Sequence, residues 1–316
     1  MGHSTGRHSR YIQLMALGRF EVYLKGVRKT FGQINQSIAD SPKVKSSQSH
    51  VINPKLLDEN LGELDVLPEY REVKELIEKS FPLIFVTGGA GTGKSTFVRW
   101  LDNEFRGKTL LCAPTGIAAI TIAGKTIHSL CRLPPSWIVD SDIKSHPRSL
   151  AKHAQILIID EISMVNANQL DAMDSFFRLN RENTKPFGGI SVVLVGDLFQ
   201  LPPIISSTTE HLFSANYKTP KFFSANAIAQ SEFHVIELTK TFRQVDQSFA
   251  DLLSDIREGK NIQETLESLN TSCKIATDPD AGTISLSPRH ADVERINNDR
   301  LGRLPGKVTI FQGKTT

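Results

Sequence analysis

The stretch that decides the fold is Gly88-Gly89-Ala90-Gly91-Thr92-Gly93-Lys94-Ser95, which fits the phosphate-loop pattern G-x-x-x-x-G-K-[ST]. It follows an apolar run at 83–87 and precedes a helical pattern of apolar residues at 97, 98 and 101. Glycines let backbone N–H groups turn toward phosphate oxygens, and the N-terminus of the following helix adds partial positive charge. We therefore predict that Lys94 reaches the β- and γ-phosphates of a nucleotide and that the Ser95 hydroxyl binds Mg²⁺.

Outward from this loop, short apolar runs alternate with helical patterns. Strands are predicted at 83–87, 109–113, 156–159, 191–195, 235–238 and 283–286. Helical spacing joins Tyr70, Val73 and Ile77, and a second amphipathic helix is predicted from residue 249 to a stop at Gly259. Strands that alternate with helices imply an α/β fold whose parallel sheet is covered on both faces.

Length and composition indicate a globular protein of two domains, or of one large and one partial domain. The chain has 316 residues, of which 39% are hydrophobic and 22% are charged. Residues 1–50 carry eight Lys or Arg against two Asp or Glu, so the remaining 266 residues sum to −3. This basic head is either a segment that contacts phosphate backbones or a solvated extension.

Cysteine usage and the apolar runs bear on location. Cys112, Cys131 and Cys273 lie far apart without metal-ligand spacing, which indicates reduced thiols and an intracellular protein of the cytoplasm or nucleoid. No apolar run reaches the ~18 residues of a membrane helix, so no membrane partner is expected. The first twenty residues contain arginines and no acids. A mitochondrial presequence is therefore an alternative, and a eukaryotic source would allow the mitochondrion or the nucleus.

Two carboxylates follow the predicted strand at 156–159. Asp160 and Glu161 stand where ligands bind in open α/β sheets, at the carboxyl end of a strand. Asp160 is predicted to hold Mg²⁺ and Glu161 to polarise the attacking water. The second acid favours a hydrolase over a kinase, which would present a substrate hydroxyl there.

Two further polar residues follow predicted strands. Gln200 lies in Gly196-Asp197-Leu198-Phe199-Gln200-Leu201-Pro202-Pro203 and is predicted to bind the γ-phosphate or the attacking water, with a generic loop as the alternative. Arg243 follows the strand at 235–238 and is predicted to neutralise charge on the transferred phosphoryl group, with a surface ion pair as the alternative.

These strings, in this order, resemble the petite-integration-frequency (PIF) family of DNA helicases, a RecD-like branch of superfamily one, group B. Other matching strings lie at 113–119 (APTGIAA), 124–129 (GKTIHS), 159–164 (IDEISM), 187–189 (FGG) and 238–244 (LTKTFRQ). The match runs from about residue 83 to residue 301. The span 166–189 is similar to an insert of that family, in which Leu170, Met173 and Phe177 predict a helical core face.

The resemblance implies a RecA-like P-loop motor that hydrolyses ATP with Mg²⁺ and moves 5′ to 3′ on single-stranded DNA. The implied biology is DNA repair, recombination and telomere maintenance, with DNA junctions as further partners and a monomeric state. The implied nucleotide site is Gly88 through Thr96, with Lys94, Glu161, Gln200 and Arg243 in catalysis and Ser95 and Asp160 as metal ligands. The implied DNA contacts are Pro114, Thr115, Gly116, Thr126 and His128. For His128, a packed structural histidine is an equal alternative.

The expected domain organisation follows from the same comparison. Residues 1–65 form a basic extension and linker, residues 66–231 form the first RecA-like domain, and residues 232–316 begin a second, incomplete one. A short wedge insert is expected at about 133–149. Its Trp137 is either a stacking surface for bases or a buried loop anchor.

Two features depart from the family pattern. The glutamine that reads adenine is replaced by Pro68-Glu69-Tyr70, so we interpret Tyr70 as a residue that stacks on a base. The His-Lys-x-Gln-Gly and Ser-Arg strings of the second motor domain do not occur in residues 232–316. The alternatives to a helicase are therefore a truncated module that binds ATP and single strands without unwinding, and a nucleotide-dependent switch.

Overall fold

The fold was analysed in a computed structural model that describes residues 66–146, 149–242, 247–272, 287 and 289–306. Three features singled out in the sequence lie outside the described residues: the basic extension at 1–65, the strand expected at 283–286, and Arg243. Cys273 also lies outside them.

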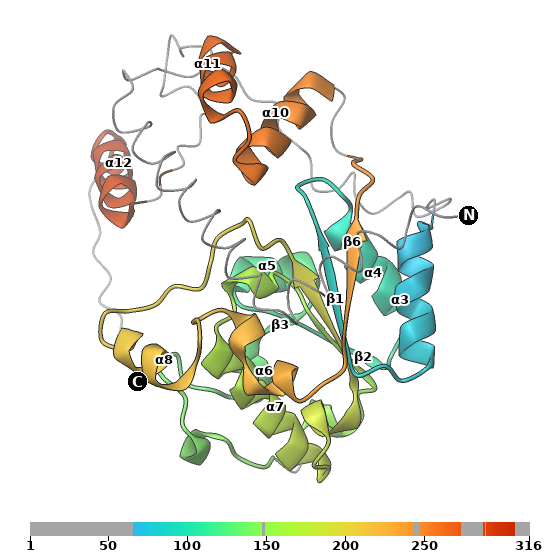
Figure 1. The fold of residues 1–316 in the computed structure, drawn as a ribbon. Helices are drawn as coiled ribbons and strands as arrows, with labels where there is room; N and C mark the ends of the chain where they lie inside the picture. Colours follow the sequence, from blue (N-terminus) through green and yellow to red (C-terminus); the bar gives the residue numbers. More distant parts are fainter. Residues whose placement is uncertain (1–65, 147–148, 243–246, 273–286, 288, 307–316) are drawn as a thin grey trace. The chain divides into compact units, whose positions relative to one another are not determined.

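A six-stranded parallel sheet forms the centre of the first part of the chain (Figure 1). The strand order is β3-β2-β4-β5-β1-β6, and every pairing is parallel. The strands are β1 (Leu83–Gly88), β2 (Thr109–Ala113), β3 (Lys125–Thr126), β4 (Ile156–Ile159), β5 (Ser191–Gly196) and β6 (Phe233–Leu238). This confirms the predicted α/β fold. The two-residue strand β3 was not predicted, because so short a strand has no apolar periodicity.

Strand β1 is apolar along its whole length because both faces of the sheet are covered. Leu83 and Phe85 belong to one buried cluster and Ile84 and Val86 to another. Successive side chains of a strand point to opposite faces, so these four residues serve two cores. The chain therefore leaves a fully buried strand when it enters the phosphate loop.

Helices from different parts of the chain cover the two faces (Figure 1). The first face is covered by α3 (Pro68–Glu78), α4 (Lys94–Glu104) and α5 (Gly116–Thr121). The second is covered by α6 (Ile127–Cys131), α7 (Ala167–Arg181) and α9 (Asn226–Ala229). In α3 the residues with the predicted helical spacing, Tyr70, Val73 and Ile77, are the buried ones. Within the described residues, no helix combines the length and apolarity that a membrane span requires.

The remaining elements are shorter or lie further along the chain. Single 3-10 turns occur at Asp140–Asp142, Leu150–Lys152, Ile162–Met164, Pro186–Gly189 and Phe222–Ser224, and α8 spans Glu210–Asn216. Beyond the sheet come α10 (Gln247–Glu258), α11 (Ile262–Ser272) and α12 (His290–Gly302). Gly259 follows α10 with φ 68°, in the left-handed region that favours glycine, as the predicted helix stop requires.

The predicted domain boundary after residue 231 is wrong for strand β6. This strand pairs with β1 from Leu83–Phe233 to Gly88–Leu238, so it belongs to the first sheet. An apolar run carries no signal of which sheet it joins, and only the pairing decides it. Contacts divide the described chain into a unit that ends at Thr265 and a unit that begins at Leu266. Helix α12 of the second unit has no buried residue.

Two asparagines of α7 hold the segment expected to be a wedge. The Asn168 amide accepts the Ile138 N–H and donates to the Ile138 carbonyl, both at 2.9 Å. Near the other end of α7, the Asn180 side chain accepts the His146 N–H at 2.8 Å. Both bonds are to backbone, so α7 fixes the path of this segment rather than its side chains.

Trp137 in the same segment packs against other aromatic rings. Its ring lies 5.0 Å from that of Phe213, edge to face, and 6.3 Å from that of Tyr217. These contacts favour the loop-anchor interpretation of Trp137 over the base-stacking one.

Candidate active site

The phosphate loop connects β1 to α4 and wraps around its own lysine. Lys94 Nζ donates to the carbonyls of Gly88 and Gly89, each at 2.9 Å. Gly93, at the N-cap of α4, has φ 86°, which only glycine adopts without strain. The Thr92 hydroxyl donates to the Gly89 carbonyl at 3.0 Å. The loop is thus preorganised by bonds within itself, with the lysine at its centre.

Burial and the neighbouring carboxylates act in opposite directions on the pKa of Lys94. Burial lowers the pKa of Lys94, while the nearby carboxylates of Asp197, Glu161 and Asp160 act to raise it. The ammonium is suited to a phosphate ligand because phosphate oxygens would replace the two loop carbonyls as its hydrogen-bond acceptors.

Tyr70 does not have the role that the sequence suggested. Its side chain is only 1% exposed and packs between Phe97 and Trp100 at centroid distances of 5.0 and 5.4 Å. A ring enclosed by the core is not available to a base, so the stacking interpretation is wrong. The hydroxyl donates instead to the Gly93 carbonyl at 3.1 Å, and burial raises the pKa of Tyr70 to about 12. Tyr70 supports the phosphate loop from behind.

The two predicted carboxylates stand at the end of β4. Asp160 is 6% exposed, and its Oδ1 accepts the Glu161 N–H at 3.0 Å. Burial raises the pKa of Asp160 to about 6, against the opposing effects of that hydrogen bond and of Lys94. Glu161 has φ 52°, so the chain turns sharply at this point. Both residues line the same cavity.

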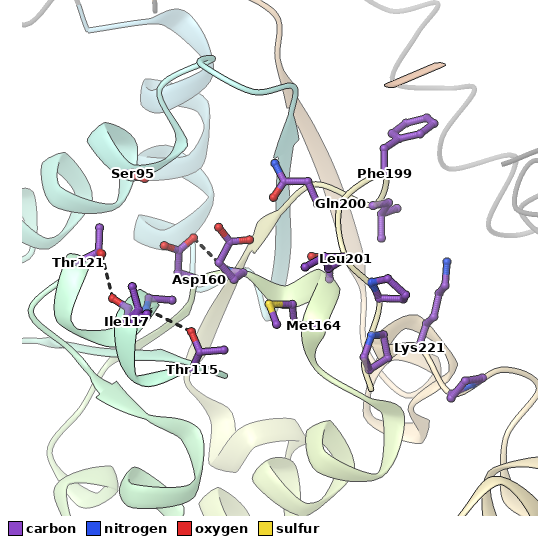
Figure 2. A pocket seen from close by; sticks show the side chains of 17 residues that line it. Ser95, Thr115, Ile117, Thr121, Asp160, Met164, Phe199, Gln200, Leu201 and Lys221 are labelled. Carbon is purple, nitrogen blue, oxygen red and sulfur yellow. Dashed lines mark hydrogen bonds between the residues drawn. The ribbon is translucent and has the colours of Figure 1, made fainter. Parts of the chain in front are cut away.

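Residues from four strand ends line one cavity of about 1130 Å³ (Figure 2). Ser95 follows β1, Thr115 follows β2, Asp160 and Glu161 follow β4, and Gln200 follows β5. In the close-up, Thr115 and Asp160 lie on one side of the cavity, and Gln200 with Leu201 lies on the other. Parallel strands all end at one edge of a sheet, which is why residues so distant in sequence meet.

The donor set at this cavity fits a magnesium ion. Ser95 and Asp160 offer hard oxygen ligands, which Mg²⁺ prefers. In the described part of the chain, no group of three or more His, Cys, Asp or Glu residues converges as a metal site. Mg²⁺ needs no such group, because it is usually held by one or two carboxylates together with phosphate oxygens and water.

The predicted DNA-side residues of the 113–119 string lie beside the cavity at the start of α5. The Thr115 hydroxyl accepts the Ala118 N–H at 3.2 Å and so caps α5. A Cβ at Gly116 would meet nothing within 4 Å, and the Ile117 side chain is 82% exposed. Pro114, half-buried, leads into this turn. The segment is open to a ligand along its backbone.

The second predicted DNA-side motif is occupied by internal bonds. The Thr126 hydroxyl accepts the Ser129 N–H at 3.2 Å and caps α6. His128 Nδ1 lies 3.2 Å from the Leu133 carbonyl, and its Nε2 lies 3.1 Å from the Gln169 amide nitrogen. With Nδ1 donating and Nε2 accepting, both ring nitrogens are used within the protein. This geometry favours the packed-histidine alternative for His128.

Sequence reasoning missed an ion pair beside the phosphate loop. Asp197 is 1% exposed, and both of its oxygens accept from Arg257 of α10, with Nε–Oδ2 at 3.0 Å and Nη2–Oδ1 at 3.1 Å. Asp197 stood in the string that contains Gln200, but nothing in the sequence pairs it with an arginine sixty residues later. Arg243 lies outside the described residues, so its predicted role stays a prediction.

Comparison with known proteins adds to this geometry. The family model for PIF1-like helicases matches residues 69–267. The ATP-dependent DNA helicase RRM3 of Saccharomyces cerevisiae is 37% identical over 259 residues, which cover 77% of this chain and 35% of that protein. The ATP-dependent DNA helicase PIF1 of Homo sapiens is 35% identical over 238 residues, which cover 72% of this chain and 36% of that protein.

A solved structure agrees with these matches. The Bacteroides Pif1 helicase, crystallised with ADP-AlF3 and single-stranded DNA, superposes with a TM-score of 0.70 at 36% identity, covering 78% of this chain and 59% of that one. This chain spans about a third of the length of the two curated relatives above. The resemblance predicted from the motifs is confirmed: the chain belongs to the PIF1-like helicase family.

Proposed function

We propose that this chain carries the ATP-hydrolysing part of a DNA helicase. The observation that carries the proposal is the single cavity at which Ser95, Asp160, Glu161 and Gln200 meet beside Lys94. Two carboxylates and an amide around one space, with the Lys94 ammonium near both carboxylates, suit phosphoryl transfer to water. Its relatives are named ATP-dependent DNA helicases.

In the proposed reaction, each residue has one task. Lys94 exchanges its bonds to the two loop carbonyls for phosphate oxygens of ATP, and the loop N–H groups enclose the same phosphates. Glu161 orients the attacking water and takes its proton, while Gln200 holds that water or the γ-phosphate. Ser95 and Asp160 would hold Mg²⁺, which supplies charge neutralisation at the phosphates when it is bound.

The proposed track for single-stranded DNA begins at Thr115 and Gly116. Both belong to the turn between β2 and α5, and Thr115 lines the same cavity as the nucleotide residues. Movement of this turn would therefore report the nucleotide state directly to the strand, held mainly through its phosphates. The whole-protein activities that we propose are 5′-to-3′ unwinding at DNA junctions, in repair, recombination and telomere maintenance.

An intracellular location and a monomeric state are further proposals. The location is supported by the two described cysteines, Cys112 and Cys131, which are buried free thiols. Imaging of the tagged protein in its cell of origin tests the location. Light scattering of the purified chain tests the monomer.

The deciding experiment is steady-state ATP hydrolysis by the chain with and without single-stranded DNA. Glu161→Gln serves as the blank, since it should keep ATP binding by calorimetry and lose turnover by 100-fold or more, on the order of removal of a key catalytic group. DNA-stimulated turnover supports the motor. ATP binding without turnover above the blank supports the alternative, a module that binds ATP and single strands. If Glu161→Gln lost binding and turnover equally, the role of Glu161 would be refuted.

A further inference from the structure

Arg257 reaches the phosphate-loop region from α10, a helix that follows the last strand of the sheet. It lies in the last turn of α10, and its side chain is 18% exposed. Nε and Nη2 both donate to the Asp197 carboxylate, which is buried at the end of β5. A two-point bond of this kind fixes the plane of the guanidinium as well as its position.

The same guanidinium contacts the segment that leads to Gln200. Its central carbon lies 4.5 Å from the centre of the Phe199 ring, and the Phe199 N–H donates to Asp197 Oδ1 at 3.1 Å. The Gln200 N–H donates to the Asp197 carbonyl at 3.0 Å. Asp197 thus holds the backbone of residues 199 and 200 by hydrogen bonds, and Arg257 packs on the Phe199 ring.

Arg257 also lies over the phosphate loop. A Cβ built on Gly89 would stand 3.9 Å from three atoms of the Arg257 side chain, in ordinary van der Waals contact. The charge of Arg257 is among the causes that lower the pKa of Lys94. The Arg257 side chain therefore lies close to the phosphate loop and contacts the loop that carries Gln200.

We propose that Arg257 is a positioning residue, which through Asp197 and Phe199 sets Gln200 against the phosphate loop and links α10 to the nucleotide site. The expected effect of Arg257 on turnover rests on the proposed ATP hydrolysis. The physical basis of the positioning is independent of turnover. Without the guanidinium, the Asp197 carboxylate is a buried unpaired charge, and it must draw water or turn outward. Either change releases the Phe199 N–H from the carboxylate and loosens the turn in which the Gln200 N–H donates to the Asp197 carbonyl.

The first test measures hydrogen exchange of residues 196–203 in Arg257→Met. The Phe199 and Gln200 amides should exchange about tenfold faster than in the parent chain, since their acceptor residue loses its partner. The matched control is Arg178→Met, which breaks a different arginine–aspartate ion pair, Arg178 Nε to Asp174 Oδ2 at 2.8 Å, spaced one helical turn apart in α7. It should leave these two amides unchanged. Equal exchange in Arg257→Met and parent, or equal acceleration in both variants, would overturn the proposal.

The second test separates positioning from a general loss of stability. Arg257→Met should lower kcat about 10- to 100-fold, as misplacement by an ångström does, with the KM for ATP within about threefold. Arg257→Lys keeps the charge but not the two-point bond, so it should fall between parent and Arg257→Met. Adding Asp197→Asn to Arg257→Met should cost little more, because both changes break one pair. An unchanged kcat in folded Arg257→Met would contradict the inference. A parent chain without turnover would refute the proposed hydrolysis instead, and hydrogen exchange would still decide the role of Arg257.

Discussion

At the scale of single residues, the tertiary environment decides what Tyr70 and Asp160 do at the nucleotide site. Tyr70 lies twenty-three positions before Gly93 and donates its hydroxyl hydrogen to the Gly93 carbonyl. Asp160 stands in a motif, but its burial, and not its identity, raises its pKa to about 6. Both residues invite a measurement that separates their effect on the site from their effect on the fold.

Tyr70→Phe removes one hydroxyl and leaves the packing of the ring intact. We expect the free energy of unfolding to fall by about 0.5–1.5 kcal/mol, the usual worth of one hydrogen bond. ATP affinity should fall a few-fold as well, because the carbonyl that orients the start of α4 loses its donor. The matched control is Tyr217→Phe, which removes a hydroxyl bonded to Asp171 at 3.0 Å. If both variants changed ATP affinity alike in calorimetry, Tyr70 would have no special tie to the loop.

Asp160→Asn should make the fold more stable near neutral pH when Mg²⁺ and nucleotide are absent. The carboxyl titrates at its ordinary value of 3.8 when unfolded and at about 6 when folded. Between these pH values the unfolded chain releases a proton that the folded chain keeps, so stability falls as pH rises to about 6 and stays low above it. The variant should gain on the order of 2–3 kcal/mol at pH 7.5 and almost nothing below pH 4. Urea unfolding across this range measures it, and a gain independent of pH would contradict the assignment.

At the scale of secondary-structure elements, side chains of one helix order a segment that has almost no regular structure. Asn168 and Asn180 of α7 bind the backbone at Ile138 and His146. The helical face of α7 was predictable from Leu170, Met173 and Phe177, which are all buried. The partners of its two asparagines were not, since a polar residue on a helix shows no period that names a distant backbone group.

Asn168→Ala tests this attachment. It removes both bonds to Ile138 at once, leaving a partly buried N–H and C=O without their partner. We expect a loss of about 1–3 kcal/mol in the free energy of unfolding. Proteolysis should cut residues 133–146 faster, while ATP binding stays at the parent level because the cavity lies elsewhere. Unchanged proteolysis would show that Trp137 and its ring contacts suffice to hold the segment.

At the scale of the whole molecule, the sheet is complete only when β6 joins it as an edge strand. Strand β1 has β5 on one side and β6 on the other, and every residue of β1 pairs with β6. Without β6, the strand that leads to the phosphate loop would become an edge strand with one row of unpaired N–H and C=O groups. The first folding unit therefore has to include residues well past the boundary that the motifs suggested.

Two fragments test the boundary. Residues 66–265 should fold and unfold in one cooperative transition, because they contain the sheet, its helices and α10. Residues 66–231 should be insoluble or lack a cooperative transition in urea. A soluble, cooperative 66–231 fragment would show that β6 adds to the sheet without being needed for it.

The sequence by itself determined the chemistry of this protein and the order of its parts. The phosphate loop, the acidic pair, the Gln200 string and the run of strands are local patterns, because each needs residues that are neighbours in the chain or share one period. The family followed from those strings in their order. Tertiary structure alone decided that β6 pairs with β1, that Tyr70 is enclosed beneath the loop, that His128 meets Gln169 and that Arg257 meets Asp197. These are contacts between residues tens or hundreds of positions apart, and they arise from the parallel strands ending at one edge of the sheet and from the closing of the two cores, which no local pattern encodes.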